Sequence, residues 1–99
     1  KNKSLIGKNS KIYGNVVNSS IGDGCIIYGS VKNSIIMDKT IIDKNSVVKN
    51  SIIGDDVHFN GKAYTCIIAD NVIAKNVFVQ NCKIWPHKII QGRIKSDVK

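Results

Sequence analysis

A short aliphatic phrase recurs along the whole chain at a nearly constant interval. The segment 31–38, VKNSIIMD, returns at 48–55 as VKNSIIGD, a shift of 17 residues. The segment 12–19, IYGNVVNS, returns at 27–34 as IYGSVKNS, a shift of 15 residues. One aliphatic position in this register is repeated at Ile6, Ile21, Ile36, Ile53, Ile68 and Ile84, and we expect these side chains to form one buried column. Self-similarity at a fixed period is typical of repeat architectures, and here it predicts six turns of one structure.

Within each turn the hydrophobic period is five or six residues. In the third turn the segments 36–41, 42–47 and 48–52 each begin with an aliphatic residue and carry a small or β-branched residue at the fifth place. An amphipathic helix would instead need apolar spacings of 3, 4 and 7. We therefore expect an all-β fold of about six triangular coils, with short parallel strands and with corners of Gly, Asn and Asp that tolerate positive φ. Six coils stacked at about 4.8 Å give a prism about 29 Å long.

Two polar columns accompany the aliphatic one. The residues two places before it are Ser4, Ser19, Ser34, Ser51, Cys66 and Cys82. One corner carries Asp23, Asp38, Asp55 and Asp70. Stacked carboxylates repel one another, so we expect these aspartates to accept hydrogen bonds from backbone N–H groups of the corner, with a bound cation as the alternative.

The cysteines show no spacing typical of a disulfide framework. Cys66 and Cys82 occupy equivalent places on successive turns, where we expect small buried thiols; a disulfide and a metal site remain as alternatives. Cys25 fills the small fifth place of a segment and is expected to be inert core. An odd number of cysteines favours a reducing compartment and a cytoplasmic location.

Composition bounds the class of protein. The 99 residues are 42% hydrophobic and 22% charged, which suits one small soluble domain and excludes disorder. A single proline and a single leucine, beside many isoleucines and valines, favour strands. No apolar run approaches the roughly 20 residues of a membrane span, and no signal peptide opens the chain, so we expect no membrane partner.

A net charge of +8 raises the question of a nucleic-acid partner. The lysines form no run, and the aromatic residues do not alternate with them as stacking platforms would. We therefore interpret them as a solvated surface and expect no nucleic-acid partner. These lysines include Lys8, Lys11, Lys32, Lys39, Lys44, Lys49, Lys62 and Lys75.

Neither histidine predicts a catalytic site. His58 ends a segment and is expected to point outward, as a surface histidine rather than a general base. His58 and His87 are too few for a three-histidine zinc site. We assign no catalytic, cofactor-binding or metal-binding residue to this chain.

The aromatic residues predict surface contacts. Tyr13 and Tyr28 lie one turn apart and are expected to stack. Three bulky residues are expected to cover one outer face and to support self-association, namely Phe59, Tyr64 and Phe78. Trp85-Pro86 is expected to cover the last coil, since proline cannot donate to a strand ladder.

The repeats resemble a known family. Segments of the form aliphatic-Gly-x-x-small-x resemble the left-handed β-helix of bacterial hexapeptide-repeat proteins. Residues 24–37, GCIIYGSVKNSIIM, resemble the C-terminal domain of sugar-1-phosphate nucleotidyltransferases of the mannose-1-phosphate guanylyltransferase or glucose-1-phosphate adenylyltransferase type. Residues 83–90, KIWPHKII, resemble the closing segment of the mannose-1-phosphate guanylyltransferase type. The resemblance implies a left-handed β-helix over 1–90, followed at 91–99 by a tail without repeats that is partly frayed.

The resemblance also implies a function. In this family an α/β domain joins a sugar 1-phosphate to a nucleoside triphosphate, with a divalent metal such as Mg²⁺, and releases pyrophosphate. None of its motifs occurs here, so we expect this chain to be inactive alone, to lie C-terminal to such a domain in a longer polypeptide, and to support homo-oligomerisation. The alternative is a hexapeptide-repeat acyltransferase that uses acyl-CoA, which an acyl-CoA binding assay would distinguish.

Overall fold

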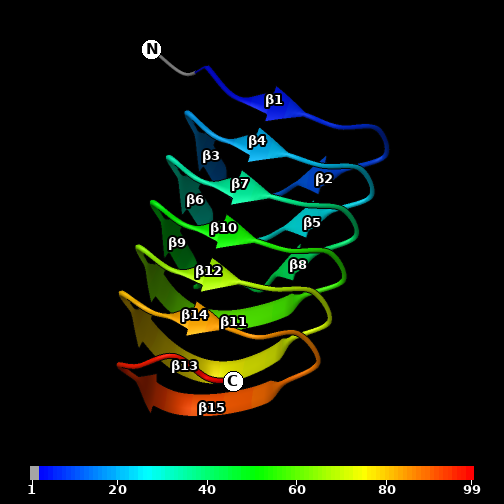
Figure 1. Cartoon of the computed structure of the whole chain (residues 1–99). Coiled ribbons are helices and arrows are strands. Elements are labelled where there is room, and N and C mark those ends of the chain that lie inside the picture. The colour runs from blue at the N-terminus through cyan, green and yellow to red at the C-terminus, as the bar shows by residue number, and fades with distance from the viewer. Residues whose placement is uncertain (1–2) are drawn as a thin grey trace.

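Six short parallel strands, stacked one above the next, form the first face of the molecule (Figure 1). The computed structural model describes residues 3–99, and none of these residues is helical, so no helix long and apolar enough to cross a membrane is found among them. The strands of this face are β1 (Leu5–Ile6), β4 (Ser20–Ile21), β7 (Ile35–Ile36), β10 (Ile52–Ile53), β12 (Ile67–Ile68) and β14 (Lys83–Ile84). Each pairs in register with the strand one coil away, as the repeat predicts.

In the first three coils, the second face and the third face are formed by separate strands. The second face is built from β2 (Lys11–Ile12), β5 (Ile26–Ile27) and β8 (Ile41–Ile42). The third face is built from β3 (Asn15–Val17), β6 (Ser30–Lys32) and β9 (Val47–Lys49). All of these strands pair in parallel with their equivalents in the adjacent coil. These coils are therefore three-sided, as expected.

In the last three coils the second and third faces merge into long strands. These strands are β11 (His58–Tyr64), β13 (Ile73–Gln80) and β15 (Ile89–Ile94). The first part of β11 pairs with β8 and its last part with β9, so one strand continues both faces. The register shifts between Phe59 and Gly61 and again between Lys75 and Val77. A bulge thus replaces the sharp corner here.

Three columns of inward side chains fill the solenoid. The first is the isoleucine column of the sequence, and five of its six members are 0–2% exposed. The prediction is wrong for Ile6, which is 45% exposed because β1 pairs with a strand on one side only. The second column contains Ile12, Ile27, Ile42, Phe59, Ala74 and Ile90. The third column contains Val16, Val31, Val48, Ala63 and Val79.

Phe59 lies in the core, so its predicted place on an outer face is wrong. Its ring is fully buried in the column that Ile42 occupies one coil earlier. The next residue of that column is Ala74, and the neighbouring column carries Ala63 in the same coil. These two small side chains leave the volume that the larger ring occupies.

Both polar columns form hydrogen-bond ladders. Each Asp carboxylate of the corner accepts a backbone N–H from the preceding coil, over 2.7–2.8 Å. This confirms the expected role of Asp23, Asp38, Asp55 and Asp70. In the serine column, each hydroxyl accepts the N–H of the equivalent residue in the next coil, at 3.1–3.2 Å. The ladders satisfy backbone groups that would otherwise be left unpaired at corners.

The corners adopt positive φ at the residues that tolerate it. Eight of the twelve non-glycine residues with positive φ are asparagines, which confirms the expectation. Thr65 is an exception at φ 56°, in the place that Asn50 and Asn81 occupy in adjacent coils. A β-branched residue in this region is strained, because its branch crowds the backbone.

The C-terminal segment continues the solenoid. β15 extends beyond residue 90 and pairs with β13 as far as Ile94, which differs from the expected frayed tail. Val98 then exchanges hydrogen bonds with the last coil, accepting from Trp85 and donating to Lys83. Trp85 itself is 41% exposed. The tail therefore covers the last strand of the first face, and the expected covering of the last coil by Trp85-Pro86 stays a prediction.

Candidate functional site

His58 forms the only ion pair among residues 3–99. Its Nε2 lies 2.8 Å from Oδ1 of Asp43, one coil away, and its side chain is half exposed as predicted. The other carboxylate oxygen of Asp43 accepts from Nδ2 of Asn60 at 3.3 Å. No serine, threonine or cysteine hydroxyl or thiol is hydrogen-bonded to this imidazole within the described residues. The arrangement orients a histidine, but it presents no nucleophile to it.

The cysteines are buried free thiols in the structure. Cys25 is fully buried, and its Sγ contacts the carbonyl oxygen of Met37. Burial raises the pKa of the Cys25 thiol. Burial, together with the neighbouring Cys66 thiol, raises the pKa of Cys82 from its ordinary value of 9.0 to about 11. Cys82 is therefore a protonated, unreactive thiol at neutral pH.

The aromatic side chains form two separate pairs. Tyr13 and Tyr28 stack with ring centroids 5.1 Å apart and planes at 12°, which confirms the prediction. Tyr64 and Phe78 make a tilted contact at 5.6 Å on the third face. The guanidinium of Arg93 lies over the Phe78 ring, 5.2 Å from its centroid. Phe78 thus has a cation and a second ring as neighbours.

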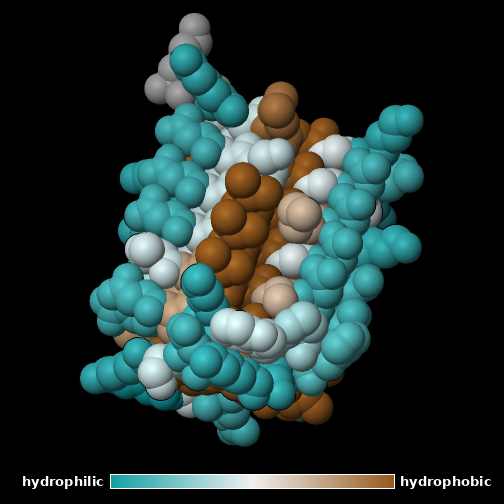
Figure 2. Space-filling model, viewed as in Figure 1, coloured by the Kyte–Doolittle hydropathy of each residue, from teal (hydrophilic) through white to brown (hydrophobic). Residues whose placement is uncertain are grey.

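An apolar stripe runs along the first face. Its outward residues on three successive coils are Ile35, Ile52 and Ile67, each 42–44% exposed and each paired in register with the next. Leu5 extends the row, and Ser20 lies between it and Ile35. Figure 2 shows this hydrophobic band along the face, with hydrophilic side chains on both sides. The corresponding outward row of the second face is interrupted by His58.

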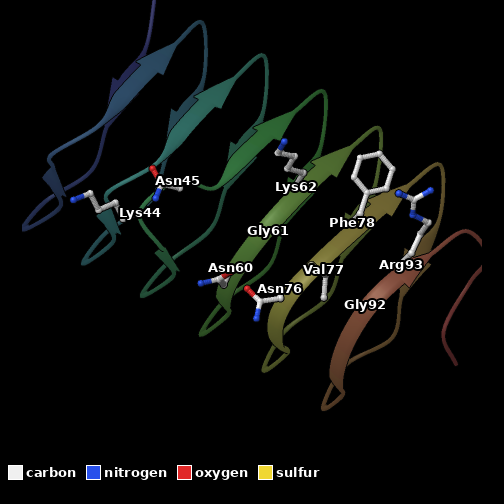
Figure 3. Close-up of a pocket in the computed structure, with 10 residues that line it drawn as sticks. All are labelled: Lys44, Asn45, Asn60, Gly61, Lys62, Asn76, Val77, Phe78, Gly92 and Arg93. Atoms are coloured by element: carbon white, nitrogen blue, oxygen red, sulfur yellow. The ribbon is translucent and has the colours of Figure 1, made fainter.

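A cationic hollow of about 540 Å³ lies over the register shifts between β11, β13 and β15. Three cations line it, namely Lys44, Lys62 and Arg93, and no carboxylate does. Lys62, Phe78 and Arg93 are equivalent residues of successive strands (Figure 3). Three amide side chains complete the lining, those of Asn45, Asn60 and Asn76. None of the three cations forms an ion pair with a described residue.

Gly61 permits the close approach of the strands beneath the hollow. Its φ of 140° lies in a region that residues with a side chain rarely adopt. A Cβ at this position would collide with the carbonyl oxygen of Val77 on β13. A side chain at position 61 would therefore force β11 and β13 apart beneath the hollow.

Sequence reasoning missed the hollow, although the repeat contained a signal for it. Lys62 and Arg93 are 31 residues apart and look unrelated along the chain. In the repeat register, however, the steps from Lys62 to Phe78 and to Arg93 are 16 and 15, which place all three on one row. Lys44 joins them from the two-residue insertion of the third coil. Lys44 and Lys62 are exposed, as expected of a solvated surface, but they share one hollow with Arg93.

No cluster of three or more His, Cys, Asp or Glu side chains that could hold a metal ion occurs among residues 3–99. The two surfaces described above are thus the candidate functional features of the described chain. The family model described as "GMPPB C-terminal domain", of the mannose-1-phosphate guanylyltransferase family, matches residues 1–98. A search of curated proteins gives no match.

Proposed function

The chain belongs to the GMPPB C-terminal domain family, and from this membership we propose that it is the non-catalytic assembly domain of a nucleotide-sugar pyrophosphorylase. Such an enzyme joins a sugar 1-phosphate to a nucleoside triphosphate and releases pyrophosphate. In this proposal an α/β domain elsewhere in the polypeptide performs that chemistry with a divalent metal. The β-solenoid holds copies of the enzyme together.

The apolar stripe is the observation that carries the assembly role. Ile35, Ile52 and Ile67 form a straight row on a flat parallel face, and none is covered by another part of the described chain. A straight row is self-complementary, because a two-fold axis near its centre places one copy's row on the other's. We therefore commit to a second copy of this chain as the occupant. Phe59 is buried and takes no part in the other predicted face, so a contact there through Tyr64 and Phe78 stays a separate prediction.

The net positive charge of the chain makes this contact depend on salt concentration. Two copies that each carry +8 repel, and salt screens this repulsion over about 10 Å at 0.1 M ionic strength. Burial of the isoleucine side chains is independent of that screening. Self-association is accordingly expected to strengthen as salt increases.

Sedimentation equilibrium tests the assembly role with matched variants. Ile52 and Ile73 are equally exposed, at 42% and 41%, but Ile73 lies on the interrupted row of the second face. Ile52→Lys should shift the protein to monomer, whereas Ile73→Lys should leave the oligomer unchanged. A wild-type chain that stays monomeric at millimolar concentration and high salt contradicts the proposal. Equal dissociation by both variants also contradicts it.

A turnover assay tests the non-catalytic role separately. The 99-residue chain, supplied with Mg²⁺, a nucleoside triphosphate and a sugar 1-phosphate, should release no pyrophosphate above the background without protein. Pyrophosphate release that scales with chain concentration would place the chemistry in this domain and refute the assignment.

A further inference from the structure

We infer that the cationic hollow over β11, β13 and β15 is a binding site for a diphosphate group. The inference uses only Lys44, Lys62, Arg93 and the amides beside them, so it stands or falls independently of the assembly role. All three cationic side chains are exposed, and none pairs with a described carboxylate; Arg93 packs over the Phe78 ring.

Charge and hydrogen-bonding groups of the hollow select an anion. Lysine ammonium and arginine guanidinium groups supply donors only, and both are typical ligands of phosphate oxygens. The nearest carboxylate along the chain, that of Asp43, is engaged by His58 and Asn60 and is not part of the lining. The concave shape lowers the exposure of a bound anion to water, which strengthens its attraction to the cations.

The spacing of the cations selects an extended anion over a single phosphate. Lys62 and Arg93 lie two coils apart on one row, and strands of a sheet are about 4.8 Å apart, so their backbones are about 9.6 Å apart. Lys44 approaches from the coil before Lys62. Long lysine and arginine side chains can converge on one phosphate, but two linked phosphates let cations from different coils each contact a separate phosphoryl group without that convergence. The hollow is also large enough for a small organic ligand, since such sites span about 300–1,000 Å³.

The aromatic ring in the hollow is not available to a nucleobase. Arg93 covers the Phe78 ring at 5.2 Å, and Tyr64 contacts it at 5.6 Å. The ring therefore orients the guanidinium rather than offering a stacking face. Recognition is directed at the phosphates, so free pyrophosphate and the diphosphate of a nucleotide share the required chemistry.

Isothermal titration calorimetry of the full chain tests the site with three small probes. Inorganic pyrophosphate and guanosine diphosphate should each bind at one site, and orthophosphate should bind at least about tenfold more weakly, since it satisfies fewer cations. Tighter binding of guanosine diphosphate than of pyrophosphate identifies a nucleotide as the source, and the reverse order identifies free pyrophosphate. Equal binding of orthophosphate overturns the inference.

Matched variants locate the binding. Lys62→Gln and Arg93→Gln should each weaken pyrophosphate binding about tenfold or more, whereas Lys11→Gln removes the same charge outside the hollow and should change it less than twofold. Arg93→Lys should fall between, because the planar fork is lost while the charge stays. Equal losses in all variants mean that net charge alone attracts the anion. That result overturns the inference, as does an oligothymidine that binds more tightly than pyrophosphate and displaces it.

Discussion

Removing the hydroxyl of Ser34 tests the ladder that joins adjacent coils. Ser34 is buried at 4% exposure in the middle of the serine column. Its Oγ accepts the N–H of Ser51 at 3.1 Å and donates to the carbonyl of Lys32 at 2.8 Å. Ser34→Ala removes both hydrogen bonds and leaves the volume nearly unchanged.

The structure sets the size of the expected effect. The carbonyl of Lys32 also accepts the backbone N–H of Asn50 at 3.1 Å, so it keeps a partner in the variant. The N–H of Ser51 loses its acceptor and is buried between coils. One unsatisfied buried donor costs about 1–3 kcal/mol, and we expect the free energy of unfolding to fall by that amount. In a domain of this size each kcal/mol lowers Tm by about 4–8 °C.

Urea denaturation followed by circular dichroism measures the change, with two control variants. Ser20→Ala removes a hydroxyl from the outward row of the first face and should alter stability by less than about 0.5 kcal/mol. Ser34→Cys should cost less than Ser34→Ala, because the Cys66 thiol of the same column donates to the carbonyl of Tyr64 at 3.2 Å, as the Ser34 hydroxyl does to that of Lys32. If Ser34→Ala and Ser20→Ala are equally mild, the ladder does not stabilise the stack and the reasoning fails.

Three further variants probe the core, a strained corner and a thiol. Phe59→Ala should destabilise the chain by about 3–5 kcal/mol in the same urea assay, since the buried ring leaves a cavity; a loss below 1 kcal/mol would refute its core position. Thr65→Asn should raise stability by about 1 kcal/mol, because asparagine tolerates φ 56°, and a lower Tm would contradict this. The pKa of Cys82 is raised to about 11 in the folded chain, against 9.0 in the unfolded chain, so the unfolded chain loses this proton at lower pH. The free energy of unfolding should therefore fall as pH rises from 9 to 11. Cys82→Ser should flatten that fall, and an unchanged slope would count against the burial of the thiol.

Most of the fold could be predicted from the sequence, because a solenoid repeats the same local structure in every coil. The spacing of the isoleucines predicted the column from Ile21 to Ile84, and the aligned aspartates and tyrosines predicted a hydrogen-bond ladder and a stack. Each of these contacts joins residues in the same register of adjacent coils. Sequence periodicity is therefore a direct record of spatial contact in this architecture.

The misplaced residues are those whose environment depends on more than register. The large side chain of Phe59 led to its prediction as a surface residue. The small side chains of Ala63 and Ala74 leave space for the ring in the core, and this can be seen only when two columns are compared. The hollow around Lys62 and Arg93 depends on the merging of two faces at a bulge, which no single segment encodes. Such features follow from packing between columns rather than from the repeat.

The proposed contact joins two copies of the chain through the first face of this domain. An isotope-filtered nuclear Overhauser experiment on an equal mixture of ¹³C-labelled and unlabelled chain observes that contact without any substitution. We expect intermolecular cross-peaks at the methyl groups of Ile35, Ile52 and Ile67. Cross-peaks confined to Ile73 and Ile89 of the second face, or none at concentrations where the chain is oligomeric, would contradict it.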